Sequence, residues 1–230
     1  TLRTLIYLIL NNRGGIAMAV IKSALELALE RTKDLQLDEN AQKIADAKIE
    51  GRKAASRYLE DPASVDFKAI LSTLDPVQRQ AFLSSAFEVL SNFIQLPTNS
   101  VVDTEKMEAI GKAIVLLCGL SARFPSEKEV KLAQQQARSL FQQILRFLSQ
   151  YQEEMKRVEQ AIRNQWAPKL KEREKQLAAA LGQNVRMDPM SDPEFAEFYR
   201  KNIESMRNNY GKALEDAKSQ LADICGFEAQ

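Results

Sequence analysis

The chain has 230 residues, of which 45% are hydrophobic and 27% are charged, so it is too apolar for a disordered protein and typical of a folded one. Its 32 basic and 31 acidic residues give a net charge of +1, which offers no support for binding to nucleic acid or to an anionic membrane surface. Histidine is absent, which excludes histidine metal sites and catalysis by histidine, including Ser–His and Cys–His pairs.

Residues 1–17 contain an apolar run that is too short to span a membrane as a helix. Gly14 and Gly15 lie just before Met18, and codons for two glycines resemble a purine-rich ribosome-binding site. We therefore expect residues 1–17 to be translated upstream sequence or a disordered segment, with Met18 as the native start. The end of a signal sequence and an initial buried segment are the alternatives, although no clear cleavage site follows.

A compact helical head is predicted for residues 18–125. Strong helix formers fill 20–31, and the polar stretch at 35–40 is expected to interrupt this helix. Asp38 then caps a second helix over 39–59, because its carboxylate accepts hydrogen bonds from free backbone N–H groups.

Two further helices of the head are indicated by their first residues. Asp75-Pro76 and Asp103 are predicted starts, since Asp caps the free N–H groups and Pro suits the first helical position. Residues 113–120 are apolar on more than one face and are therefore expected to lie in a central core helix. In the predicted helix over 39–59, Gly51 lies near the middle, where glycine is an unfavourable residue.

A long helical hairpin is predicted for residues 126–230. Ser126 and Glu129 form a capping-box pattern at its start, and no stop signal follows until Gly182, which suits the left-handed position after a helix. The first helix of the hairpin is thus roughly 55 residues and about 80 Å long. Pro168 lies inside it and is expected to kink it, because proline deletes one backbone hydrogen bond.

An apolar seam runs along this long helix in steps of three and four, changing to steps of four near Trp166. Its members are Phe141, Ile144, Leu148, Tyr151, Met155, Val158, Ile162, Trp166, Leu170, Leu177 and Leu181. A second seam follows the predicted start of the last helix, which is either Asp192-Pro193 or the capping pattern of Ser191 and Glu194. Because a short turn joins the two helices, they are expected to run antiparallel and to pack seam against seam. The sequence therefore predicts an all-α fold with a compact helical head and a long antiparallel, coiled-coil-like hairpin.

The turn of the hairpin has an unusual composition, with Arg186, Met187 and Met190 beside two Asp-Pro pairs. The first interpretation is turn formation, in which Asp and Pro fix the reversal and the methionines close the end of the seam. The second is a partner-contact site, because exposed methionines form adaptable binding surfaces. Trp166 is likewise either packed in the seam or a docking anchor for a partner.

Residues 169–181 are highly charged, but their charges alternate in sign at helical spacing. We interpret them as a solvated helix face and not as a nucleic-acid-binding stripe. No glycine-rich phosphate-binding loop is present in the sequence. We identify no catalytic, cofactor-binding or metal-binding residue, and we expect no cofactor.

Two stretches resemble an uncharacterised all-helical bacterial family, of the type found in spirochaetes, to which no function is assigned. They are IKSALELALERTKD near Met18 and LGQNVRMDPMSDPEFAEFYRKNIESM around the hairpin turn. The resemblance extends over most of 18–225 and implies a helical cytoplasmic protein. It transfers no catalytic residue to this sequence.

These patterns favour a non-enzymatic scaffold or adaptor protein that acts through the hairpin. A chaperone-like binder of apolar protein segments is the alternative, and a small-ligand domain is a third. The pocket of that domain would lie in the head around Phe82, Phe87, Phe93 and Cys118. The expected partner is a protein of unknown identity, and a homodimer stays open. We expect no nucleic-acid partner and no membrane span. Cys118 and Cys225, as small buried hydrophobic residues, favour a reducing cytoplasm.

Overall fold

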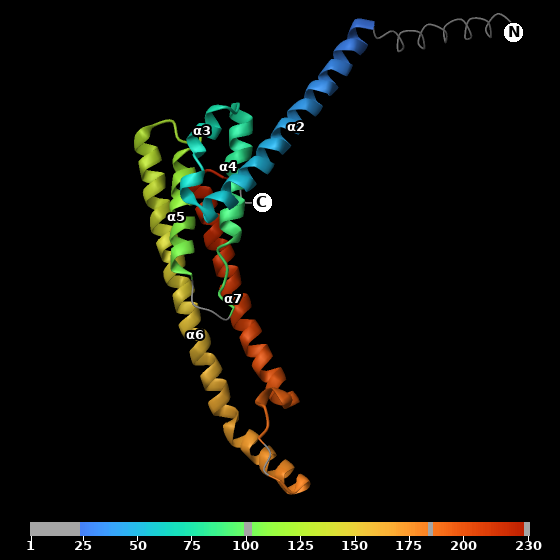
Figure 1. The fold of residues 1–230 in the computed structure, drawn as a ribbon, viewed down its shortest axis with the longest axis vertical. Coiled ribbons are helices and arrows are strands. Elements are labelled where there is room, and N and C mark those ends of the chain that lie inside the picture. Colours follow the sequence, from blue (N-terminus) through green and yellow to red (C-terminus); the bar gives the residue numbers. More distant parts are fainter. Residues whose placement is uncertain (1–23, 99–102, 184–185, 228–230) are drawn as a thin grey trace, which may run out of the picture. The chain divides into compact units, whose positions relative to one another are not determined.

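The computed structural model describes residues 24–98, 103–183 and 186–227, and within them the regular elements are all helical, which confirms the all-α fold. The elements are α2 (Ala24–Glu60), η1 (Pro62–Ser64), α3 (Phe67–Ser72), α4 (Pro76–Asn92), α5 (Thr104–Gly119), α6 (Glu127–Leu181), η2 (Pro189–Ser191) and α7 (Pro193–Cys225) (Figure 1). The chain divides into two units, residues 1–47 and 48–230. The packing described below lies within the second unit.

The predicted interruption at 35–40 is wrong, because α2 is one continuous helix from Ala24 to Glu60. Asp38 therefore lies inside the helix and is not its N-cap. The physical reason is that the stretch contains neither Gly nor Pro, and that its Leu, Gln and Glu residues are good helix formers. The predictions for residues 1–17 and for Met18 lie outside the described residues.

The predicted helix starts at Asp75, Asp103 and Ser126 are confirmed. The Asp75 carboxylate accepts hydrogen bonds from the backbone N–H groups of Val77 and Gln78, both at 2.9 Å, and the Gln78 side chain accepts one from the Asp75 N–H at 3.0 Å. Asp103 and Ser126 each accept one backbone N–H bond in the same way. Each cap satisfies backbone donors that a helix start otherwise leaves unpaired, a contribution of about 1 kcal/mol.

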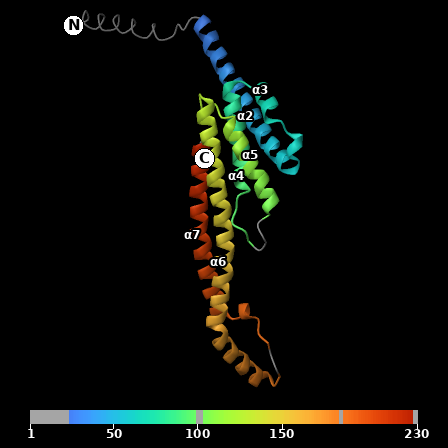
Figure 2. The same ribbon diagram turned by 90° about the vertical axis from the view of Figure 1, so that its left-hand side faces the viewer.

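The core of the second unit forms where α5 packs against both α6 and α7, with α4 against α5. Figures 1 and 2 both show α5 beside the long α6. The largest fully buried side chains are Phe67, Phe82, Leu83, Leu90, Ile94, Ile110, Ile114, Leu117, Ile144, Tyr151, Phe195 and Phe227. The expectation that 113–120 lies in a central core helix is confirmed, since Ile114, Leu117 and Cys118 have no exposed surface.

The four residues proposed to line a ligand pocket in the head do not share one cavity. Phe82 and Cys118 are fully buried, and Phe87 packs against Phe227 with ring centroids 5.1 Å apart. Phe93 is instead exposed and lies under the ammonium group of Lys106. Phe82 and Cys118 fill the core by packing, while Phe87 also lines a pocket between α2, α4 and α7, so the four residues do not line one pocket together.

Cys118 and Cys225 are both free thiols with no exposed surface, which confirms their interpretation as buried residues. They come from α5 and α7 and are joined by a hydrogen bond between their side chains. This hydrogen bond and burial raise the pKa of the Cys225 thiol far above its usual range. The Cys225 thiol therefore stays protonated, and unreactive as a nucleophile, at neutral pH.

The two helices of the hairpin, α6 and α7, pack along each other as predicted. Helix α6 has 55 residues, ends at Gly182 in the left-handed conformation and curves over its last third, the part that contains Pro168 (Figure 2). Five seam residues of α6 are buried, Phe141, Ile144, Leu148, Tyr151 and Ile162, and four are half-buried, Met155, Val158, Trp166 and Leu170. The last two seam residues are exposed, Leu177 by 39% and Leu181 by 59%.

Two tyrosines of α7 are bonded to glutamates of α6. The ring of Tyr210 lies 5.0 Å from those of Phe147 and Tyr151, and its hydroxyl donates a hydrogen bond to Glu154. This hydrogen bond and burial raise the pKa of Tyr210 to about 12. The Tyr199 hydroxyl donates a hydrogen bond to Glu159 at 2.7 Å. Burial, the larger cause, and this hydrogen bond, the second cause, raise the pKa of Tyr199 to about 12.

These two pKa values predict a loss of stability in alkaline solution. The folded-state pKa values of both tyrosines lie above the ordinary 10.0. The stability that their neutral hydroxyls provide is therefore fully present below pH 10 and is lost as the pH rises from about 10 to about 12. Urea unfolding over this range should show a falling free energy of unfolding, and Tyr199→Phe with Tyr210→Phe should remove part of that slope. An unchanged slope in the double variant would contradict the two Tyr–Glu bonds.

Candidate functional site

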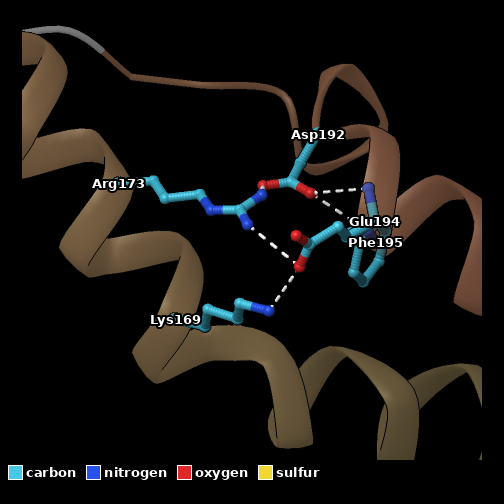
Figure 3. A network of polar contacts seen from close by, with 5 residues as sticks. All are labelled: Lys169, Arg173, Asp192, Glu194 and Phe195. Atoms are coloured by element: carbon cyan, nitrogen blue, oxygen red, sulfur yellow. Dashed lines mark hydrogen bonds and ion pairs between the residues drawn. The ribbon is translucent and has the colours of Figure 1, made fainter.

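The far end of the hairpin holds a cluster of four charged side chains, Lys169, Arg173, Asp192 and Glu194, which we call the hairpin-end network (Figure 3). Asp192 is the buried N-cap of α7, as the sequence predicted. One of its carboxylate oxygens accepts hydrogen bonds from the backbone N–H groups of Glu194 and Phe195, both at 3.0 Å. The other oxygen forms an ion pair with the Arg173 guanidinium group of α6.

Glu194 adds a second, exposed layer to this network. Its carboxylate contacts Nη2 of Arg173 at 3.0 Å and the ammonium group of Lys169. The Lys169 hydrogen bond and charge, with the nearby charge of Arg173, hold the pKa of Glu194 below its usual range. Because Glu194 and Lys169 are both more than half exposed, this layer contributes little to stability. The buried Asp192–Arg173 pair is therefore the main polar connection between α6 and the start of α7.

Trp166 packs inside the hairpin next to this network. Its ring lies edge-on to Phe195 at 5.8 Å and tilted against Phe198 at 5.6 Å, between ring centroids. The ammonium group of Lys169 lies 4.5 Å from the Trp166 ring centroid, close enough for a cation–π contact. Trp166 is only partly exposed, so the structure places it in the seam, which was the first of its two interpretations.

The connection between α6 and α7 carries the other three predicted contact residues. The backbone N–H of Met187 donates to the Glu174 side chain at 3.0 Å, and the Met187 side chain is half-buried. Asp188 caps η2 by accepting from the N–H of Met190 at 3.0 Å. Arg186 is exposed, and Met190 is 49% exposed. Asp and Pro thus form the turn as expected, while Arg186 and Met190 remain available to a partner.

Sequence reasoning missed an exposed apolar surface on the last two turns of α6. Residues 174–181 extend beyond the point where Arg173 meets the start of α7 (Figure 1). With no helix of the hairpin opposite them, Leu177 and Leu181 are exposed. Met190 on the connection between α6 and α7 is exposed as well, and we call these three exposed side chains the hairpin-end apolar surface. The prediction that the seam is paired up to Leu181 is therefore wrong, because α7 begins too late in the chain to cover it.

The spacing of the seam contains a signal for this ion pair. Trp166, Leu170 and Leu177 lie on the seam, and the step of seven between the last two passes over Arg173. A charged residue at a seam position faces the partner helix and needs a partner for its charge there. The interpretation of residues 169–181 as a solvated helix face is therefore wrong at Arg173.

A family of unknown function, DUF6657, has a model that matches residues 68–223 of this chain, which is more than half of its length. The chain belongs to this family. No curated protein and no solved structure matches the chain. The DUF6657 region contains α4, α5, α6, all but the last two residues of α7, and the whole hairpin-end network. The resemblance to a family without an assigned function is thereby confirmed, and its occurrence in spirochaetes stays a prediction.

The hairpin-end network is built to join two helices. Every carboxylate in it is bonded to a cation, and Asp192 also caps a helix, so neither acid is left to exchange protons with a substrate. Across the residues that the structure describes, no group of three or more Cys, Asp or Glu side chains is arranged to hold a metal ion. None of the described helices is both long enough and apolar enough to cross a bilayer.

Proposed function

We propose that the protein is a non-enzymatic scaffold or adaptor that binds a partner protein through the end of its helical hairpin. The observation that carries this proposal is the hairpin-end apolar surface. Leu177 and Leu181 lie one turn apart on the same helix face, with Met190 exposed on the connection that follows. Large apolar side chains gathered on a surface are typical of protein interaction sites.

The surroundings of this surface support the proposal. The buried Asp192–Arg173 pair and the packing of Trp166 on Phe195 join α6 to α7 immediately beside it. The exposed leucines are therefore presented from a fixed helix end, which reduces the entropy lost when a partner binds. An amphipathic helix fits this face, because leucines spaced by four residues match the repeat of its apolar positions. The two free, buried cysteines support a cytoplasmic location for the protein.

Replacing Leu177, Leu181 and Met190 by serine is expected to abolish partner binding and leave the fold unchanged, because all three side chains are exposed. The measurement is quantitative capture from native cells with the tagged protein and with this triple variant. Leu132→Ser is the matched control, since Leu132 is 55% exposed near the other end of the same helix. Loss of one specific partner from the triple variant alone supports the proposal.

Equal capture by the triple variant and the control would overturn the proposal. Analytical ultracentrifugation of the purified proteins tests the remaining possibility that the partner is a second copy of the chain. In that case the unmodified protein and the Leu132→Ser control sediment as dimers, and the triple variant sediments as a monomer. Retention of many unrelated unfolded proteins, instead of one partner, would favour the chaperone-like alternative.

A further inference from the structure

A polar pocket lies between the last part of α2, helix α4 and the C-terminal part of α7, well away from the hairpin end. Its volume is about 190 Å³. Three cationic side chains line it, Lys48 and Arg52 from α2 and Lys218 from α7. Lys218 and Asp192 are separated by 26 positions along α7, which is about 39 Å of helix. The pocket is therefore separate from the surface of the proposed function.

The charges in this pocket do not cancel. Arg52 pairs with Glu88 at 3.5 Å, and Lys218 pairs with Glu215 at 2.9 Å. Both glutamates also line the pocket, and Lys48 has no ion-pair partner among the described residues, so the lining carries one cation in excess. The Lys218 side chain is only 12% exposed, and its one partner, Glu215, is 68% exposed. A lysine buried to this degree gains when a second anion approaches its ammonium group.

Neutral hydrogen-bond donors complete the lining. Ser84 and Ser91 face the pocket from α4 and Ser219 from α7, and Asn92 adds a side-chain amide. The Ser84 hydroxyl oxygen accepts from Gln80 at 3.5 Å, which leaves its own proton to be donated. Ser91 is 7% exposed, and its hydroxyl bonds to none of the described residues. Hydroxyl and amide donors beside excess positive charge are the groups that bind an oxyanion.

We propose that this pocket binds a small phosphate-bearing anion, either inorganic phosphate or a small phosphate monoester. A phosphate group offers several acceptor oxygens in a tetrahedral arrangement, so it can accept hydrogen bonds from donors on three different helices at once. The pocket is smaller than the roughly 300–1,000 Å³ of sites for drug-sized ligands, which favours a ligand of few atoms. Lys48 supplies the unpaired positive charge for the phosphate, and Lys218 binds at the buried side.

Thermal unfolding and isothermal titration with sodium phosphate at constant ionic strength test this proposal. The melting temperature of the full chain is expected to rise with phosphate concentration, because a ligand that binds the folded state stabilises it. Lys48→Gln is expected to weaken phosphate binding about tenfold or more, as a lost hydrogen bond to a charged group does. Lys156→Gln is the matched control, because it removes the same charge from an exposed position on α6.

Three results would overturn the proposal. The first is a rise in melting temperature with phosphate that is no larger than the rise with chloride. The second is an equal loss of phosphate affinity in Lys48→Gln and Lys156→Gln. The third is full phosphate affinity in the double variant Ser91→Ala with Lys48→Gln. Titration with glycerol phosphate then distinguishes the two sources. Binding of both ligands supports a phosphate monoester, and binding of phosphate alone supports the free ion. Neither set of results depends on the leucines at the hairpin end, so the two proposals fail or succeed separately.

Discussion

Replacing Gly51 by alanine is expected to destabilise the protein by about 2 kcal/mol, although alanine is the better helix former by about 1 kcal/mol. A Cβ atom at this position would lie 2.3 Å from the backbone carbonyl oxygen of Phe82 and 2.3 Å from the Ser85 hydroxyl oxygen. Phe82 has no exposed surface, so α4 cannot shift without disturbing the core. Overpacking of this kind costs about 1–3 kcal/mol, and a backbone neighbour places it at the upper end.

The matched control is Gly211→Ala in α7, where the added Cβ meets no atom within 4 Å. This substitution is expected to stabilise the protein by about 0.5–1 kcal/mol, because only the helix preference changes. Urea unfolding of the two variants measures both free energies. Opposite signs are the expected result. A stabilising effect of alanine at both positions would show that α2 and α4 do not approach each other as closely as the structure has them.

The second large effect is expected at the hairpin end, where Arg173→Met should lower the free energy of unfolding by about 2–3 kcal/mol. The substitution leaves the Asp192 carboxylate buried without its cation, and removing one partner of a fully buried pair costs about 3–5 kcal/mol. The Arg173 side chain is 29% exposed, so water reaches the site and the expected cost lies below that range. Hydrogen exchange should show the loss at the first turn of α7.

The double variant Arg173→Met with Asp192→Asn separates the lost charge pair from the lost helix cap. Asparagine caps a helix about as well as aspartate and carries no charge. The double variant is therefore expected to be more stable than Arg173→Met alone, because no unpaired charge is left buried. Lys175→Met is the control, since Lys175 and its partner Glu172 are both exposed, and it should change stability by less than about 0.5 kcal/mol. A double variant less stable than Arg173→Met would contradict this account.

Local signals in the sequence were sufficient to predict much of the fold. Asp75, Asp103, Ser126 and Asp192 are all helix caps, because a cap depends on hydrogen bonds within a few residues of the same chain. The end of α6 at Gly182 follows from the same kind of local rule. The break predicted at 35–40 failed for the opposite reason, since a polar stretch without Gly or Pro is compatible with both a loop and a helix.

Contacts between distant segments are what the sequence did not reveal. Gly51 is a weak point when α2 is considered alone, and its role in the crossing with α4 is visible only in three dimensions. At the candidate site, local composition indicates Arg186, Met187, Met190 and Trp166. The structure adds Leu177 and Leu181, whose exposure depends on where the opposite helix begins. The sequence spacing indicates that Arg173 lies on the seam, but it does not indicate that Asp192 is the partner of Arg173.

The distance between the hairpin end and the buried residues where α7 meets α5 has a consequence for how members of this family diverge. Along α7, Asp192 and the fully buried Leu221 are separated by 29 positions, or about 44 Å of helix. Substitutions that far apart act almost independently on stability. Leu177, Leu181 and Met190 are therefore free to mutate without lowering the stability of the core. Under the proposed function, a lineage can exchange one binding partner for another through a few changes at these positions and keep the same fold throughout.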